Sequence, residues 1–445
     1  MNRRRLLALS GSLLAGALAG CSAPGPRGNE PTDAPRVEPD VAGDALEQLV
    51  ADANSFSTAL YRETAAETPA ENGLVSPLSV TTALAMAYAG AREETRAQMG
   101  EALRYSLEDE SLHRAFNALQ RELNARAREL DPEELPTEYA ADDDPIPFEL
   151  TLLNAVWGQA GFPFEREYLE LLRDHYGGGL RKVDYAADPE RARKTINDWV
   201  ADRTEDRIEE LVPAGAIGPL TRLVLTNAVS FRANWQHPFD PENTERVPFT
   251  SLRGATSAVA MMHRTDPLPY AEVDGTQAVE LPYLGGEVAM LVLLPSPGDF
   301  ESVEASLSGG TISTVVDSLE RREGTIAIPK FEFGDGHGLK PALRDLGMHQ
   351  AFDPQAADFS GMADIEGGGD RLYIDDVYHD TYIGVDETGT AAAAATGVVI
   401  NYTAAPAETF KFVADRPFLF AIRDRPTGTI LFLGRVVDAG AAQAG

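Results

Sequence analysis

One segment near the start of the chain constrains the fold more than any other, because it predicts a helix that is apolar on nearly every side. Within residues 78–89 the apolar side chains surround the helix axis: Val80, Ala83, Leu84, Met86 and Ala87. Ser76 and Pro77 are typical of a helix start, with Ser76 as the N-cap and Pro77 at the first helical position. A helix that is apolar all round must be covered by protein on all sides. The sequence therefore predicts a central helix inside a large domain.

The order of the predicted elements favours one α+β domain. Helical spacing of apolar residues starts near Leu46 and recurs up to Glu210, so most of the helices come first. Strand-like runs dominate afterwards. The chain ends on two apolar runs, 418–422 and 430–437, whose connecting turn predicts a hairpin. Helices followed by strands indicate an α+β fold rather than a series of βαβ units.

The charge of the chain narrows the classes of partner. Its 445 residues include 38 basic and 70 acidic ones, which gives a net charge of −32, and only five of the basic residues are lysine. So acidic a surface repels nucleic acid, heparin-like polyanions and anionic membranes. High salt would screen the self-repulsion of such a surface. A halophilic source is therefore expected, with an ordinary acidic secreted protein as the alternative.

The first 20 residues predict an export signal. Arginines at positions 3–5 precede the apolar stretch 6–19, which is too short to span a membrane comfortably. The tetrapeptide at 18–21 resembles a lipobox and ends in Cys21, the only cysteine, so we expect lipid on Cys21 and no intrachain disulfide. A plain secretory signal with an incidental cysteine is the alternative, and the arginines fit twin-arginine or general export.

The expected location follows from that signal. Residues 21–43 would carry the lipidated cysteine and a proline-rich tether ahead of the folded domain. The chain is then expected in the extracellular space or on the outer face of the cytoplasmic membrane, anchored at Cys21.

No motif of an enzyme active site is present in the sequence. The seven histidines include no pair at metal-ligand spacing, and Gly-x-Ser-x-Gly, phosphate-binding glycine loops and HExxH are absent. We therefore expect no enzyme activity, no catalytic residues, no metal and no cofactor. An unrelated lipoprotein hydrolase stays open as an alternative function.

A stretch of small residues near the C-terminus has three interpretations. Residues 386–390, Asp-Glu-Thr-Gly-Thr, are followed by five alanines at 391–395. Thr388 or Thr390 could cap a short alanine helix, or the stretch could be a flexible linker. Because a strand-like run at 372–385 leads into it, the stretch could also slip between two β-strands without clash.

Motifs spread over residues 44–438 together resemble the serpin family of serine protease inhibitors. They are, in order, Asn72 to Ser79 with Gly90-Ala91, Thr195 to Val200, Leu225 to Phe231 with Trp235, Val279 to Tyr283, Ile328 to Phe331, Leu346 to Met348, Asp415 to Phe418 and Leu433 to Val436. The resemblance implies a single serpin domain over residues 44–439, with about nine helices and about three β-sheets. It also implies an exposed reactive loop at about 387–409, and a monomer is expected.

The stretch of small residues then resembles the hinge of an inhibitory serpin. The resemblance assigns to the hinge Glu387, Gly389, Thr390, Ala391, Ala392, Ala393, Ala394, Ala395 and Thr396. In that family a protease attacks the loop, forms an acyl-enzyme and is trapped when the cleaved loop enters the main sheet as a new strand. Thr390 and every second residue up to Thr396 would point inward, because a strand alternates its faces. These residues are small and uncharged, so the hinge is competent for insertion.

The reactive bond is placed by the family's usual count from Glu387. The count puts it between Thr403 and Ala404, with Tyr402 or Asn401 as the alternative residue before the bond. None of these residues is basic, so the resemblance implies a subtilisin-like or chymotrypsin-like target rather than a trypsin-like one. Residues 401–403 also form an N-glycosylation sequon, for which chance in a polar loop is the simpler explanation.

The resemblance also assigns residues that hold the main sheet together. His379 takes the place of the shutter histidine and Trp235 that of the breach tryptophan. The hydrogen-bonding neighbours expected for His379 are Ser76, Ser79 and Asn227. These roles are structural, since they keep the sheet closed until the loop inserts.

The expected partners are a target serine protease, bound covalently, and a membrane reached only through the lipid on Cys21. Residues 129–144 carry eight acidic side chains and are expected to form a solvated loop. The helix before them lacks a basic face, so no heparin-like activator and no nucleic acid is expected. A non-inhibitory serpin that acts as a binding or chaperone module is the alternative to an inhibitor.

Overall fold

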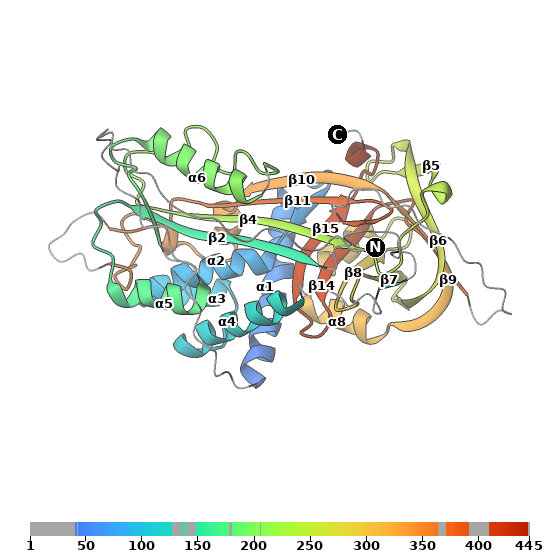
Figure 1. The fold of residues 1–445 in the computed structure, drawn as a ribbon, viewed down its shortest axis with the longest axis horizontal. Coiled ribbons are helices and arrows are strands. Elements are labelled where there is room, and N and C mark those ends of the chain that lie inside the picture. The colour runs from blue at the N-terminus through green and yellow to red at the C-terminus, as the bar shows by residue number, and fades with distance from the viewer. Residues whose placement is uncertain are drawn as a thin grey trace, which may run out of the picture.

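The computed structural model describes residues 41, 43–126, 135–136, 139, 148–177, 180–204, 206–363, 371–390 and 409–443. Within these residues the chain forms nine α-helices and two hydrogen-bonded β-sheets. Figure 1 shows how they are arranged in space. The predicted α+β fold is confirmed. The helices are α1 (Gly43–Glu67), α2 (Pro77–Gly90), α3 (Glu93–Ala102), α4 (Asp109–Arg126), α5 (Arg166–Tyr176), α6 (Pro189–Arg203), α7 (Phe300–Ser306), α8 (Gly309–Asp317) and α9 (Lys340–Asp345).

The six-stranded sheet has the order β10-β11-β12-β4-β2-β3. Its strands are β10 (Phe331–Gly338), β11 (Val377–Val385), β12 (Gly389–Thr390), β4 (Leu223–Asn234), β2 (Glu149–Gln159) and β3 (Arg181–Val183). β11 runs parallel to β4 and pairs with it directly over residues 377–381 and 225–229. The two-residue strand β12 lies between the same two strands at their other end.

The nine-stranded sheet contains the remaining strands. They are β1 (Gly73–Val75), β15 (Ile430–Val436), β14 (Phe418–Asp424), β8 (Val288–Leu294), β7 (Thr276–Pro282), β6 (Thr256–Val273), β9 (Glu320–Pro329), β13 (Phe410–Val413) and β5 (Glu245–Thr250). β14 and β15 form the predicted C-terminal hairpin.

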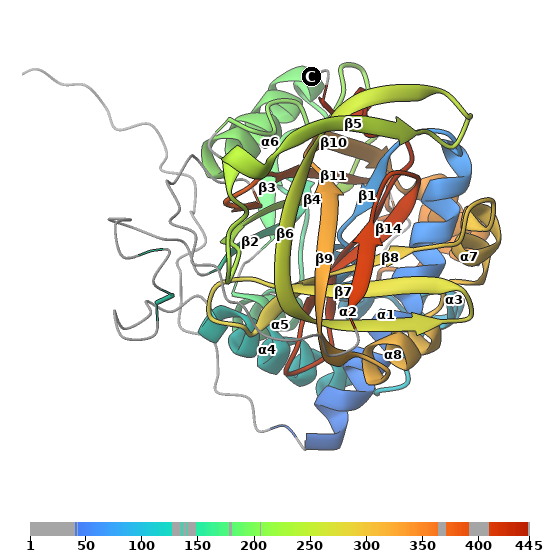
Figure 2. The same cartoon turned by 90° about the vertical axis from the view of Figure 1, so that its right-hand side faces the viewer.

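Two of the three expected sheets are joined to each other by continuous hydrogen bonding, so the described residues form two sheets. The 18-residue strand β6 pairs with β5 along its first part, with β9 along its middle and with β7 at its end. Figure 2 shows β6 running past β5 at one end and β7 at the other. One long strand therefore joins what would otherwise be two separate sheets.

The helix that the sequence placed at the centre is the centre of the fold. Every residue of α2 except Ala89 is buried, and the helix packs against α1, β2, β4 and β15. The expected cap is different in one respect. Ser76 occupies the N-cap position, but its hydroxyl donates to the carbonyl of Leu431 at 2.8 Å and makes no bond to the helix. The Ser76 hydroxyl therefore bonds to Leu431 on β15 and to no amide of its own helix.

The six-stranded sheet is covered on both faces. In Figure 1, α6 lies over one face, while α2 and α5 lie on the other. The face under α6 has its own hydrophobic cluster, which includes Trp157 on β2 and Ile196 and Val200 on α6. Trp199 on α6 meets Trp157 edge to face, with 5.5 Å between the ring centroids. No helix among the described residues is both long and apolar enough to cross a membrane.

A buried histidine between α4 and α5 makes the stability of the fold depend on pH. His113 is 3% exposed, and its Nδ1 lies 2.6 Å from the hydroxyl of Tyr176. Burial, with a smaller contribution from the neighbouring His175, lowers the pKa of His113 to about 3. An unfolded histidine has a pKa of about 6.5, so the unfolded chain takes up a proton that folded His113 refuses. Below about pH 6.5 this difference destabilises the fold.

We therefore expect His113→Gln to flatten the pH dependence of stability between pH 6.5 and 4. The wild type should lose up to about 1.4 kcal/mol per pH unit through this residue, and the variant should not. The measurement is the midpoint of thermal unfolding at fixed ionic strength. His349→Gln, at an exposed position, is the control. An unchanged slope for His113→Gln would show that this histidine does not carry the effect.

Candidate functional site

A tight turn at the end of β11 starts the hinge, which we define as residues 386–390. The Asp386 carboxylate Oδ1 accepts hydrogen bonds from the Thr388 amide at 2.8 Å, the Thr388 hydroxyl at 2.7 Å and the Gly389 amide at 3.1 Å. The amide of Asp386 donates to the carbonyl of Gly389 at 3.0 Å. The chain reverses direction here, so β12 runs antiparallel to β11.

The turn delivers β12 into the gap between β11 and β4. Thr390 pairs with Val385 on one side and with Ala233 on the other, and Gly389 pairs with Asn234. The sequence left a capped helix, a linker and a strand open for this stretch, and the resemblance implied an exposed loop from about residue 387, whereas Glu387, Thr388 and Thr390 are buried. Of the three interpretations, entry between two strands is the one that Gly389 and Thr390 fulfil. The other expected hinge residues, Ala391 to Thr396, lie outside the described residues.

Gly389 is required at its position by the close approach of β4. A Cβ on residue 389 would lie far inside van der Waals contact of the Ala233 carbonyl oxygen. Backbone atoms cannot yield as the end of a flexible side chain can. Any residue other than glycine would therefore push β12 away from β4.

Thr390 points inward. Its side chain is 1% exposed, and its hydroxyl lies 2.7 Å from the hydroxyl of Tyr283. The Tyr283 ring stacks on Trp235, with centroids 4.6 Å apart and an interplanar angle of 10°. The Thr390 side chain is therefore small, buried and hydrogen-bonded through its hydroxyl.

The segment after β4 holds the backbone of the hinge. Three successive hinge carbonyls accept hydrogen bonds from it. The indole Nε1 of Trp235 donates to Asp386 O at 3.0 Å, and the Trp235 amide donates to Thr388 O at 2.9 Å. The Phe239 amide donates to Glu387 O at 2.8 Å. Trp235, which the resemblance assigned as the breach tryptophan, therefore lies against the hinge.

The side chain of Glu387 is held by a charge and a hydroxyl. Lys330 Nζ lies 2.7 Å from Oε2, and the Thr244 hydroxyl donates to Oε1 at 2.8 Å. Burial alone would raise the pKa of the Glu387 carboxyl, but the hydrogen bonds from Lys330 and Thr244 outweigh it and lower the pKa. The ion pair therefore stabilises the hinge above the ordinary pKa of glutamate and is lost as the pH falls through the lowered value.

The predicted shutter residues meet at the closed part of the sheet. His379 Nε2 accepts from the Ser76 amide at 3.0 Å, and His379 Nδ1 is hydrogen-bonded to Asn227 Oδ1. The side-chain Nδ2 of Asn227 donates to the Ser79 hydroxyl and to Asn154 Oδ1, both at 2.6 Å. Ser79 thus reaches His379 through Asn227. His379 and Asn227 are also direct partners in the pairing of β11 with β4.

Tyr139 contacts Trp235, and the sequence did not predict this contact. It was assigned to a solvated acidic loop, and this is wrong for Tyr139, which is 2% exposed. Its hydroxyl donates to the carbonyl of Trp235 at 2.5 Å. Tyr139 is the only aromatic residue in the run 129–144, and that was the available signal. Asn154, Thr244 and Tyr283 were missed as well, because each meets its partner through folding alone.

Several predicted residues are not placed. The reactive-bond residues Tyr402, Thr403 and Ala404 and the lipidation residue Cys21 lie outside the described residues. Over the part of the chain that the structure describes, no group of three or more histidine, cysteine, aspartate or glutamate side chains is arranged to hold a metal ion.

Comparison with known proteins gives one consistent family. The profile of the family described as Serpin (serine protease inhibitor) matches residues 51–439. An uncharacterized serpin-like protein of Thermococcus kodakarensis is 39% identical over 420 residues, which are 93% of this chain and 92% of that protein. The leukocyte elastase inhibitor of Bos taurus is 34% identical over 400 residues, 88% of this chain and 99% of its own length.

A solved structure agrees with these relatives. The crystal structure of a thermophilic serpin, tengpin, in the native state superposes with a TM-score of 0.77 at 27% sequence identity. The match covers 90% of this chain and 96% of that one.

The close approach at residue 389 can be tested by Gly389→Ala. We expect the added methyl group to expel β12 from the sheet, so amide hydrogen exchange at Thr390 should rise by roughly tenfold or more. Gly384→Ala, on the neighbouring β11, is the matched control, because its Cβ would meet nothing closer than 3.7 Å. Equal exchange at Thr390 in the two variants would contradict the seating of β12.

Proposed function

Because the chain belongs to the serpin family, we propose that it is a single-use inhibitor of secreted serine proteases. The protease seryl oxygen attacks the carbonyl carbon of Thr403, the amine of Ala404 leaves as a new N-terminus, and an ester joins the two proteins. The freed loop then enters the six-stranded sheet and carries the protease with it before water can hydrolyse the ester.

The observation that carries this proposal is the position of β12 between β11 and β4. Thr390 already occupies a position between β11 and β4, small, inward and hydrogen-bonded. The two strands beyond it are apart at one end and paired at the other. A strand that begins at Thr390 has its entry point prepared, and its first backbone pairs have formed.

The register of β12 predicts where an inserted loop would go. Thr390 opposes Ala233 on β4 and Val385 on β11. If both antiparallel registers continue for six more residues, Thr396 would lie between Asn227 on β4 and His379 on β11. These two residues are the hydrogen-bonded pair that closes the sheet. Insertion up to Thr396 must therefore separate His379 from Asn227. The Thr396 hydroxyl, which can both donate and accept a hydrogen bond, would then lie between them.

We propose the target from the loop sequence. Thr403, with Tyr402 as the alternative, gives no positive charge to a protease pocket. Enzymes of the subtilisin-like or chymotrypsin-like kind accept such residues, and one relative is named for inhibition of leukocyte elastase. The proposed setting is outside the cell, with the chain anchored at Cys21 and working without a heparin-like activator in a medium of high salt.

The first test mixes the mature protein with a subtilisin-like enzyme and separates the products on a denaturing gel. We expect a covalent complex that survives boiling in detergent. Thr390→Arg should lower the yield of complex by roughly tenfold or more, because an unpaired buried charge costs several kcal/mol and each 1.4 kcal/mol is a factor of ten. The cleaved, released form should replace it. Thr390→Ser keeps a small hydroxyl side chain and is the matched control.

Two outcomes would count against the proposal. Clean cleavage of the wild type with no complex would favour a non-inhibitory serpin that acts as a binding module. A normal yield of complex from Thr390→Arg would remove the role of insertion at this position.

The second test concerns the anchor. We expect the wild-type protein, expressed in a host that processes lipoproteins, to sediment with membranes, and Cys21→Ser to be released in soluble form. Fractionation followed by immunodetection measures the ratio. If Cys21→Ser remains with the membranes to the same extent, Cys21 carries no anchor.

A further inference from the structure

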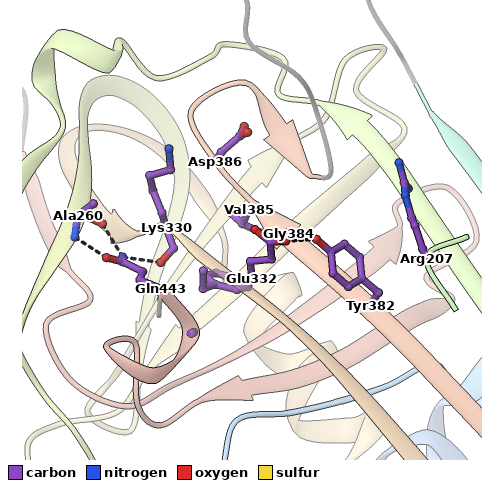
Figure 3. Close-up of a pocket in the computed structure, with 11 residues that line it drawn as sticks. Arg207, Ala260, Lys330, Glu332, Tyr382, Gly384, Val385, Asp386 and Gln443 are labelled. Carbon is purple, nitrogen blue, oxygen red and sulfur yellow. Dashed lines mark hydrogen bonds between the residues drawn. The ribbon is translucent and has the colours of Figure 1, made fainter. Parts of the chain in front are cut away.

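The C-terminal tail lies against the point where the chain crosses from one sheet to the other. β9 ends at Pro329 in the nine-stranded sheet and β10 begins at Phe331 in the six-stranded sheet, so Lys330 alone joins them. After β15 the chain forms a short 3-10 helix, Ala441–Gln443, beside this crossover. Figure 3 shows the Gln443 side chain reaching both Ala260 and Lys330.

The side-chain amide of Gln443 forms hydrogen bonds of the kind that the backbone of a neighbouring strand would form. Its Nε2 donates to Lys330 O at 2.7 Å and to Ala260 O at 3.0 Å, and its Oε1 accepts from the Ala260 amide at 2.8 Å. The Lys330 amide donates to Ala260 O at 2.9 Å. The backbone of Lys330 is therefore fixed at both its N–H and its carbonyl, although the residue belongs to neither sheet.

The side chain of Lys330 depends on this fixed backbone more than a packed residue would. Its ammonium group holds Glu387 at 2.7 Å. Lys330, Asp386 and Gln443 border the same open pocket of about 540 Å³, seen in Figure 3. The lysine side chain is 37% exposed. Because this long side chain is partly exposed, the position of its main chain helps to decide where its ammonium group can reach.

We propose that Gln443 is a positioning residue of the hinge, which fixes the main chain of Lys330 so that its ammonium group holds Glu387 and keeps β12 seated. The effect on β12 is a property of the uncleaved protein and needs no protease. The consequence for inhibition rests on the proposed function: a looser seat changes how often the hinge leaves the sheet before the protease arrives.

The experiment measures the hinge without a protease. Gln443→Met keeps the length of the side chain and loses all three hydrogen bonds. We expect amide exchange at Gly389 and Thr390 to rise roughly three- to tenfold at constant pH and salt, as the loss of one net hydrogen bond would produce. Gln443→Glu loses both donated bonds and should act in the same direction. Ala441→Ser, at an exposed position of the same tail, is the control and should match the wild type.

A double-variant cycle separates positioning from a general loss of stability. In the Lys330→Met background the ion pair is already absent, so Gln443→Met should add less than about twofold to the exchange rate. A spectroscopic signature accompanies it. With 5-fluorotryptophan at the three tryptophans, the resonance of Trp235, which contacts the hinge, should move in Gln443→Met, and those of Trp157 and Trp199 should not.

Either of two results would overturn the proposal: wild-type exchange in Gln443→Met, or an equal rise with and without Lys330. The outcome is independent of inhibition. If the wild type traps no protease and Gln443→Met still loosens the hinge through Lys330, the positioning role stands and the proposed function fails. If trapping is normal and the exchange does not change, the reverse holds.

Discussion

The structure depends on one unequal contact, the pairing of β11 with β4, which is closed at one end and held apart at the other. At the closed end the strands share backbone pairs over residues 377–381 and 225–229, and His379 and Asn227 join them by a side-chain hydrogen bond. At the other end β12 takes the place of that direct pairing. Backbone groups inside a sheet need partners, so a gap between two strands favours any segment small enough to enter it. The residues that follow Thr390 are small, and they are chemically suited to this gap.

The open end is held by segments that are far apart in the sequence. Trp235 holds two hinge carbonyls, and Tyr139 holds the carbonyl of Trp235. Lys330 holds Glu387, and Gln443 fixes Lys330. Lys330 is one of only five lysines in a chain of net charge −32. Trp235 and Tyr139 are large, fully buried side chains, so they fill volume as well as donate hydrogen bonds. These contacts restrain the hinge through a few hydrogen bonds, which is compatible with the insertion that we propose.

The predictions from sequence succeeded where the physical cause was local or periodic. The apolar residues around 78–89 required a buried helix, and α2 is one. The turn between two apolar runs predicted the hairpin of β14 and β15. They failed where a distant group competed with a local one. The Ser76 hydroxyl was expected to cap its helix but donates to Leu431, and Tyr139 leaves an acidic run to be buried at Trp235. Such choices depend on which partner the fold brings within 3 Å, and spacing in sequence does not contain that distance.

The sequence by itself determined the fold class, the family resemblance and the small, uncharged character of residues 388–396, because these follow from side-chain size, charge and periodicity. It left open whether the stretch after Asp386 is a helix, a linker or a strand, since glycine, threonine and alanine permit all three. Tertiary structure decided that question for Gly389 and Thr390. The Asp386 turn reverses the chain, and β11 and β4 offer unpaired backbone at the right spacing. A strand this short gains its hydrogen bonds only from neighbours that are already in place, so its conformation is a property of the sheet around it.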